Sequence, residues 1–183
     1  MLGLTKGTVA LCEHDPEWAE NAREAIVVLS FVFGGIAVDI QHTGSTAIKS
    51  IKAKPIIDIV VGVSDFAAAR ALLPALAAAD VIHRPSNDLS DYMMFVMGDI
   101  ERRFITHHIH VVPHNGEEWG NQMNFRDFLN SNPSKAKEYE ALKIALWHSH
   151  RDNRELYTDG KQSFFDSAFV EAAEWRRSEF VDV

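Results

Sequence analysis

A Gly-Ser-Thr tripeptide at positions 44–46 is the clearest candidate for phosphate chemistry in the sequence. Gly44 and Ser45 lie where a predicted strand ends and a short helical turn can begin, so that their backbone amides point outward without a partner. Such amides, with the hydroxyl groups of Ser45 and Thr46, can bind phosphate oxygens, and glycine lets the backbone approach a ligand closely. An ordinary turn is the alternative for this tripeptide taken alone.

Asp58 interrupts a segment from Pro55 to Val63 that is otherwise apolar. A carboxylate in a buried strand is costly unless a partner compensates its charge. Strand alternation lets its side chain point toward the rim beside the Gly-Ser turn. The partner can be a divalent cation, with magnesium, manganese and zinc as the candidates, or a basic residue such as Lys54 or Arg103. Carboxylates hold magnesium in phosphoryl transfer, which makes Asp58 a candidate catalytic residue.

A histidine-rich segment, His-His-Ile-His at positions 107–110, lies within a further predicted strand. His108 and His110 face the same way on such a strand. Two imidazoles at this spacing can bind one metal ion, contact phosphate when protonated, or transfer protons. The alternative is that they only form hydrogen bonds inside a polar cleft.

Basic residues elsewhere in the chain can supply charge-assisted donors to phosphate. The candidates are Lys54, Arg102, Arg103, Arg126 and Lys161. Each of them can instead be an exposed partner in a surface salt bridge.

These residues together resemble the motif of the nucleotidyltransferase superfamily, in which Gly-Ser is followed after a gap by an aspartate on a strand. Twelve residues separate Ser45 from Asp58. The wider sequence resembles the GrpB family, with a match over nearly the whole chain. The segments that carry this resemblance are His-Asp-Pro-Glu-Trp at 14–18, Gly-Ser-Thr at 44–46, Lys-Pro-Ile-Ile-Asp-Ile at 54–59, His-Ile-His-Val-Val at 108–112, Phe-Arg-Asp-Phe-Leu at 125–129 and Tyr-Thr-Asp-Gly-Lys at 157–161.

The resemblance implies an α+β fold of the nucleotidyltransferase-like type: a mixed β-sheet flanked by helices, with a helical C-terminal third. It implies a cleft with the Gly-Ser turn and the aspartate strand as one wall. It also implies that His110 stands where the superfamily places its third carboxylate, so that Asp58 and His110 are the candidate metal ligands. The candidate catalytic residues are Asp58 and Ser45, and the candidate phosphate or substrate contacts are Gly44, Ser45, Thr46, Lys54, Arg103, His108 and Lys161.

The sequence departs from the superfamily motif at Val60, where a second carboxylate is expected two residues after the first. With Asp58 alone, a pair of magnesium ions cannot be held in the usual way. A displaced acid such as Glu101 is one possible substitute. A second departure is Ile-Lys-Ser at 48–50, where the family usually has a Pro-Gly turn.

Hydrophobic periodicity predicts the elements that must position these residues. Asp15 is expected to cap a helix that ends near Gly34, and Pro74 is expected to kink or restart a later one. Strands are predicted at 8–11, 36–42, 55–63, 92–97 and 104–112, with a hairpin turn at Gly98 and Asp99, and helices at 16–34, 65–79, 117–130, 133–148 and 160–177.

Composition limits the classes of protein to which the chain can belong. Its 183 residues fit a single domain spanning 1–183, and 46% apolar with 24% charged residues is typical of a globular protein. The net charge of −8 argues against general nucleic-acid binding. With Cys12 as the only cysteine, and no signal-length or membrane-length apolar segment, we expect a cytoplasmic protein without a membrane partner. Oligomeric state is not predicted.

Three functions compete at this point. The first is an enzyme that transfers a nucleotidyl group to a small-molecule acceptor. The second is an accessory module that binds a nucleotide or coenzyme-like phosphate without catalysis, which the absence of an acid at Val60 favours slightly. The third is a metal-dependent hydrolase centred on His108 and His110 with Asp58.

Overall fold

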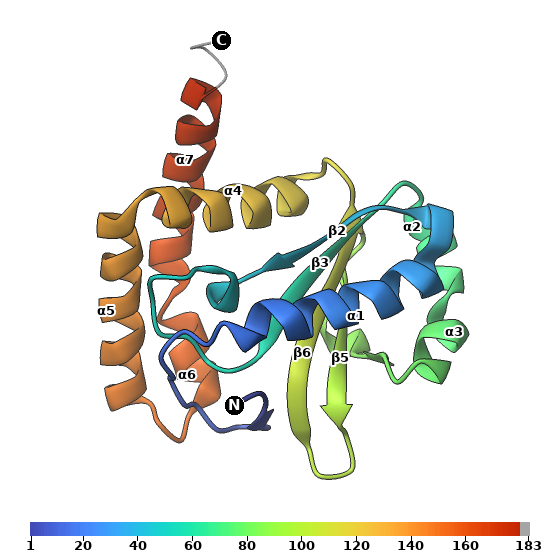
Figure 1. The fold of residues 1–183 in the computed structure, drawn as a ribbon, viewed down its shortest axis with the longest axis horizontal. Coiled ribbons are helices and arrows are strands. Elements are labelled where there is room, and N and C mark those ends of the chain that lie inside the picture. The colour runs from blue at the N-terminus through green and yellow to red at the C-terminus, as the bar shows by residue number, and fades with distance from the viewer. Residues whose placement is uncertain (180–183) are drawn as a thin grey trace.

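A six-stranded mixed β-sheet forms the centre of the protein in this computed structural model, which describes residues 1–179 (Figure 1). The strand order is β2-β3-β6-β5-β4, and β1 pairs with β6. Strands β3 and β6 run parallel, whereas the other pairs are antiparallel. The bounds are β1 (Leu4–Thr5), β2 (Ala37–Thr43), β3 (Ile57–Val63), β4 (Ile82–His83), β5 (Met93–Asp99) and β6 (Phe104–Pro113). The mixed α+β architecture predicted from the sequence is confirmed.

Helices cover both faces of this sheet, and the C-terminal third of the described chain is helical (Figure 1). The bounds are α1 (Glu17–Phe33), α2 (Phe66–Ala71), α3 (Leu73–Ala78), α4 (Glu117–Ser131), α5 (Pro133–Ser149), α6 (Arg154–Asp159) and α7 (Gln162–Glu179). Short 3-10 helices are η1 (Gly34–Ile36), η2 (Ser45–Ala47) and η3 (Pro85–Asn87).

The main hydrophobic core lies between one face of the sheet and helices α1, α2 and α3. Alternation within β3 sends Ile57, Ile59 and Val61 to this face, where they join Trp18 and Leu29 of α1 in one buried cluster. The intervening residues of β3 and β6 therefore face the other side of the sheet. Asp58, His108 and His110 belong to that second set.

Helices α4 to α7 form a second layer on that opposite face. Their own core is largely aromatic, with Phe125 of α4, Tyr139 of α5 and Phe164 of α7 in one cluster. Helix α4 also packs directly on the sheet, where Trp119 contacts a cluster with Val60 and Val112. The sheet and this helical layer enclose the space in which the polar residues of β3 and β6 lie.

The beginning and end of α1 follow the signals in the sequence. The amide of Glu17 donates a hydrogen bond to Asp15 Oδ1 at 3.1 Å, as expected of a capping aspartate. At the other end Gly34 adopts a φ of 51°, a backbone conformation that favours glycine. The helix predicted at 65–79 restarts at Leu73, with Pro74 in the first turn of α3.

Several predicted boundaries are wrong. The strand expected at 8–11 is absent, because Leu4–Thr5 instead pairs with β6 and the 8–11 segment has no ladder partner. Gly98 and Asp99 lie within β5, at an irregularity in its pairing with β6, and the hairpin turn falls at 100–103 instead. The short strand β4 and the short helix α6 were not predicted, since neither is long enough to show a hydrophobic period.

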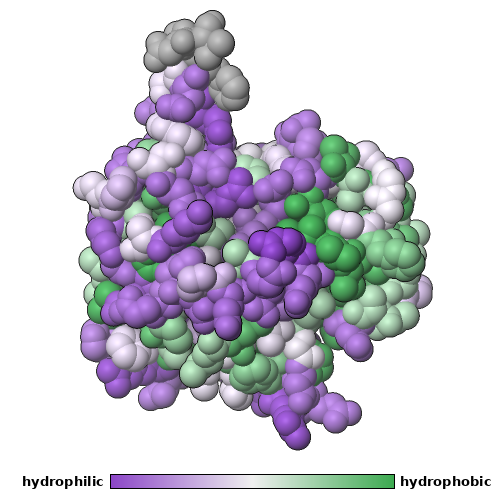
Figure 2. Space-filling view, viewed as in Figure 1, coloured by the Kyte–Doolittle hydropathy of each residue, from purple (hydrophilic) through white to green (hydrophobic). Residues whose placement is uncertain are grey.

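Exposed apolar side chains gather over the C-terminal half of α1 and the start of β2, where Figure 2 shows a green patch. Its most exposed members are Val27, Phe31 and Val38, and Phe31 has an exposed fraction of 90%. Among residues 1–179, no helix combines the length and the apolar character that crossing a membrane requires.

Candidate functional site

A cleft of about 990 Å³ lies between the sheet and the layer formed by α4 to α7. Gly44 and Ser45 line it together with Asp58, His108 and His110. Residues far apart in the sequence, and predicted separately as candidates, are thus brought to one place. The geometric requirement that the hydroxyl at 45 and the carboxylate at 58 share a hollow is met.

The register of the sheet explains why these groups meet. Asp58 is paired with Thr43 on the antiparallel strand β2 and with His108 on the parallel strand β6. His110 lies two residues further along β6, on the same face. Gly44 directly follows β2, so the Gly-Ser turn begins beside Asp58.

Ser45 and Thr46 point in different directions within the short 3-10 helix η2. The hydroxyl of Ser45 lies 3.3 Å from the hydroxyl of Tyr139, at the cleft. Thr46 is buried, and its hydroxyl lies 2.9 Å from Nε2 of His42 beneath the turn. Burial lowers the pKa of His42 to about 4, so this histidine is neutral at pH 7. Unlike Gly44 and Ser45, Thr46 does not line the cleft, because the tight turn directs its side chain into the protein.

Asp58 is the centre of a hydrogen-bonded group of side chains. Its Oδ1 lies 3.1 Å from Nδ1 of His108 and 3.7 Å from Nε2 of His110. Burial opposes ionisation of Asp58, but its interactions with His108 and His110 outweigh this effect and hold the pKa of Asp58 well below its ordinary value. The carboxylate is therefore ionised at neutral pH, and its side chain keeps 28% of its surface exposed.

Arg154 and Tyr92 fix the orientation of the two histidines. Arg154 Nη2 lies 3.2 Å from Nε2 of His108, and since arginine can only donate, that nitrogen must accept. His108 is then the neutral tautomer that donates from Nδ1 to Asp58, in keeping with its pKa, which burial lowers. On the other side, the hydroxyl of Tyr92 lies 2.6 Å from Nδ1 of His110.

A cluster of cations borders the same cleft. Lys54, Lys143, Arg154 and Lys161 all line it, and within residues 1–179 none of the four forms an ion pair with a carboxylate. Lys161 is only 9% exposed and Lys143 only 2%. Buried charges of this kind normally have a partner.

Aromatic rings provide part of the environment of these cations. The ammonium groups of Lys54 and Lys161 lie 5.3 and 5.1 Å from the ring centre of Tyr157, and that of Lys143 lies 4.6 Å from Tyr139. Burial and neighbouring positive charge, chiefly that of Lys161, lower the pKa of Lys54 and of Lys143 to about 7. The positive charges therefore repel one another, and an anion bound in the cleft would reduce this repulsion.

Val60 has a structural reason for being apolar. Its side chain is fully buried in a cluster with Val112 and Trp119, against which Tyr92 and Met123 pack. Helix α4 thus covers the strand position at which the superfamily motif has its second carboxylate. A carboxylate at position 60 would lie beneath this helix and not in the cleft.

The donors present fit a single divalent cation better than a pair. Asp58 Oδ1 and His110 Nε2 face each other at 3.7 Å, and a carboxylate with an imidazole suits manganese or zinc. Within residues 1–179, no group of three or more His, Cys, Asp or Glu side chains is placed to hold a metal ion. A cation bound here would need further ligands from the substrate or from water.

Several predicted residues lie away from the cleft. Arg103 is exposed in the β5–β6 turn with a φ of 57°, and within residues 1–179 it neither lines the cleft nor forms the ion pair with Asp58 that was considered for it. Arg102 and Glu101 occupy the same exposed turn, and Glu101 therefore cannot replace the missing acid. The turn lies at the end of the β5–β6 hairpin, and none of these three residues lines the cleft.

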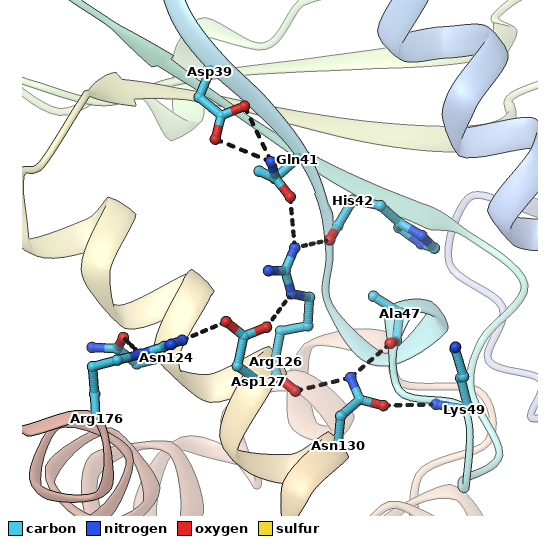
Figure 3. A network of polar contacts seen from close by, with 10 residues as sticks. All are labelled: Asp39, Gln41, His42, Ala47, Lys49, Asn124, Arg126, Asp127, Asn130 and Arg176. Carbon is cyan, nitrogen blue, oxygen red and sulfur yellow. Dashed lines mark hydrogen bonds and ion pairs between the residues drawn. The ribbon is translucent and has the colours of Figure 1, made fainter. Parts of the chain in front are cut away.

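Arg126 does not line the cleft but takes part in a network of polar contacts between elements of the fold (Figure 3). Its guanidinium donates to Gln41 Oε1 at 2.9 Å, to the carbonyl of His42 at 3.0 Å, and to Asp127 at 2.7 Å. Asp127 in turn pairs with Arg176 of α7. The network joins the edge strand β2 to α4 and α7, which positions the helical layer over the cleft.

Four important residues of the cleft were not predicted: Tyr92, Tyr139, Lys143 and Arg154. Tyr139 and Lys143 are four apart on α5, and this spacing was visible in the sequence as one face of a helix. Nothing in the sequence indicated that the face bordered Asp58. Arg154 lies on α6, which was itself not predicted.

Comparisons with known proteins give a consistent result. A family model described as GrpB protein matches residues 8–171. The Glutamate-rich protein GrpB of Alkalihalophilus pseudofirmus is 37% identical over 173 residues, which cover 93% of this chain and 99% of that protein. The crystal structure of the conserved protein GrpB from Enterococcus faecalis has a TM-score of 0.83 at 27% identity, covering 91% of this chain and 99% of that one.

A more distant likeness concerns the fold alone. The Cid1 poly(U) polymerase, in a crystal structure with MgGTP bound, has a TM-score of 0.50 at 13% identity. The match covers 75% of this chain and 44% of the polymerase chain. The sheet and its flanking helices are therefore similar to those of a nucleotidyltransferase.

Proposed function

The chain belongs to the GrpB family, and from that premise we propose that its cleft binds a nucleotide through the phosphate groups. In this proposal the phosphates lie between the Gly44–Ser45 turn and the cations Lys54, Arg154 and Lys161. A divalent cation held by Asp58 and His110 accompanies them. The function that fits this arrangement best is nucleotidyl transfer to a small-molecule acceptor.

The observation that carries the proposal is the group of cations without a carboxylate partner. Lys54, Lys143, Arg154 and Lys161 are four of the six lysine and arginine side chains that line the cleft, and the charge of the Asp58 carboxylate acts on three of them, Lys54, Arg154 and Lys161. Lys161 is nine-tenths buried, so water does not compensate its charge well. Phosphate oxygens would supply the missing negative charge and accept charge-assisted hydrogen bonds.

The Gly-Ser turn supports the same location for the phosphates. Gly44 has a φ of 65°, which glycine adopts without strain, and the turn it opens leads into η2 at the cleft. The hydroxyl of Ser45 is held near that of Tyr139, which keeps it on the cleft side of the turn. A divalent cation between Asp58 and the phosphates would neutralise charge on the phosphate oxygens.

A non-catalytic nucleotide- or coenzyme-binding module is the second candidate, and Val60 is the observation that favours it. The buried valine leaves Asp58 as the carboxylate on this stretch of β3. Binding and catalysis therefore need separate measurements. A histidine-centred hydrolase has less support, because Arg154 and Asp58 already occupy both ring nitrogens of His108.

A ligand screen tests the proposal. ATP, GTP, CTP, UTP, pyrophosphate and dephospho-coenzyme A are each added to the full chain with Mn²⁺, and the melting temperature is recorded. A ligand that binds the native state raises this temperature by mass action. We expect at least one nucleotide to raise it, and a weaker response to the matching nucleoside, which lacks phosphate. Equal responses to nucleotide and nucleoside, or no response to any compound, would refute the proposal.

A further inference from the structure

Glu118 of α4 presents a carboxylate to the cleft from the same helix that covers Val60. We infer that Glu118 is the base that accepts the proton of the acceptor hydroxyl group during nucleotidyl transfer. The inference rests on the proposed function, because it needs a nucleotide in the cleft. It assigns the second acid to α4, whereas the other carboxylates that line the cleft besides Asp58 are Glu155 and Asp159 of α6.

The position of α4 explains why the acid comes from a helix. Trp119 packs on Val60 and Val112 and so closes the sheet surface at position 60. Gly62, one step further along that face, would meet the ring of Trp119 at 2.7 Å if it carried a Cβ atom. The adjacent residue, Glu118, lines the cleft. Helix α4 therefore removes the usual location for a carboxylate and provides a new one next to it.

Hydrogen bonds orient Glu118 relative to Asp58. Gln122 Nε2 donates to Glu118 Oε1 at 2.8 Å, and Gln122 Oε1 accepts from the hydroxyl of Thr43 at 3.1 Å. Thr43 is the cross-strand partner of Asp58. The hydroxyl of Thr43 also donates to the backbone carbonyl of Asp58 at 3.5 Å, so Gln122 and Thr43 hold Glu118 beside the strand that carries Asp58, as expected for a base oriented by a supporting residue.

Glu118 lines the cleft together with Tyr92, whose hydroxyl lies 2.6 Å from Nδ1 of His110. Within residues 1–179, Oε2 of Glu118 has no hydrogen-bond partner, and the side chain has no cation beside it, so one oxygen is free to accept a proton.

In the proposed step, the acceptor oxygen attacks the α-phosphorus of the nucleotide, and a new oxygen–phosphorus bond forms. The bond between the α-phosphorus and the oxygen that bridges to the β-phosphate breaks, and pyrophosphate leaves. The proton of the acceptor hydroxyl passes to Glu118. With water as the acceptor, the products are a nucleoside monophosphate and pyrophosphate.

The test uses water as the acceptor and four nucleoside triphosphates labelled at the γ-phosphate, which leaves in pyrophosphate, with Mn²⁺ and the full chain. Glu118→Gln is the main variant, because its amide oxygen can still accept from Gln122 and preserve the fold. We expect it to lower pyrophosphate release by about 10²-fold or more while the nucleotide Kd changes by less than about threefold. The matched control is Glu117→Gln, an exposed neighbour that does not line the cleft, and it should leave both quantities unchanged.

Chemical rescue separates a base from a residue that only shapes the cleft. In Glu118→Ala, added formate can take the place of the missing carboxylate and should restore part of the rate of pyrophosphate release. Formate should not restore this rate in Asp58→Asn. Full activity of Glu118→Gln, or no rescue by formate, would overturn the inference. So would a chain that binds nucleotide but releases no pyrophosphate, which would leave the binding proposal intact. Failure to bind any nucleotide would refute the proposed function itself.

Discussion

Gly44 packs so closely on Asp58 that a single methyl group would not fit between them. A Cβ atom built on Gly44 would lie 2.7 Å from Cβ of Asp58 and would overlap its carboxylate. The turn and the aspartate are separate motifs in the sequence, yet in the fold they form one surface. Glycine at 44 is therefore required by its neighbour as well as by its positive φ.

Gly44→Ala should damage both the fold and the cleft. The positive φ strains an L residue, and the methyl group must displace the carboxylate of Asp58, so we expect a loss of about 1–3 kcal/mol in the free energy of unfolding. Nucleotide binding should weaken by more than this loss explains. Chemical denaturation and ligand titration of the same sample measure the two effects. Unchanged affinity in a folded Gly44→Ala protein would contradict this account of the turn.

Gly120→Ala is the matched control for that change. Gly120 lies within α4, and a Cβ atom there would have no neighbour within 4 Å. Alanine in a helix interior is favoured over glycine by about 0.5–1 kcal/mol, so this variant should be slightly more stable than the parent. Its nucleotide affinity should not change.

Val60→Asp tests whether α4 seals the second motif position. A carboxylate there would be buried against Trp119 without a partner, so the free energy of unfolding should fall by about 3 kcal/mol or more. Activity should not increase. Val38→Asp, on the exposed face of β2, makes the same chemical change in water and should cost about 0.5 kcal/mol or less. A stable and more active Val60→Asp protein would show that position 60 opens into the cleft.

The buried Lys143 should make stability depend on pH. Its pKa in the folded protein is lowered from 10.5 to about 7, chiefly by burial. Between these values the unfolded chain binds more protons than the folded one, so the free energy of unfolding should rise as the pH increases from about 7 toward 10. Lys54 contributes in the same direction, since its pKa is also lowered to about 7.

Lys143→Met should make this rise shallower by removing one of the two contributions. Lys137→Met, an exposed change on the same helix, should leave it as in the parent protein. Urea denaturation between pH 7 and pH 9 measures the slope for all three proteins. Parallel curves for Lys143→Met and the parent would show that Lys143 is not destabilised by its surroundings.

The strands β2, β3 and β6 and the alternation of side chains within them could be predicted from the sequence, because strand alternation is a local property. The same reasoning placed His108 and His110 on one face of their strand, and the register of β3 and β6 shows that this is the face on which Asp58 lies. The outcome at Thr46 shows the limit of this method. A 3-10 turn rotates successive side chains away from one another, so Ser45 and Thr46 could not be assigned to one surface without coordinates.

Some cations of the cleft could likewise be predicted from the sequence, and others could not. Lys54 is adjacent to the aspartate strand, and it was predicted. Arg154 and Lys143 reach the cleft only because α5 and α6 fold back over the sheet, and no local pattern indicates such long-range packing. Arg103 does not line the cleft because β6 aligns His108 with Asp58, and Arg103 comes before the start of β6, in the exposed β5–β6 turn.

The most direct test of the central claim is calorimetric titration of a nucleoside triphosphate with Mn²⁺ into the parent protein, Lys161→Met and Arg103→Gln. The account predicts that binding to Lys161→Met is weaker by about tenfold or more, since a charge-assisted contact to phosphate is worth about 1.5–3 kcal/mol, whereas Arg103→Gln binds like the parent. Equal affinity in all three proteins would contradict the claim that the buried cations of the cleft bind phosphate.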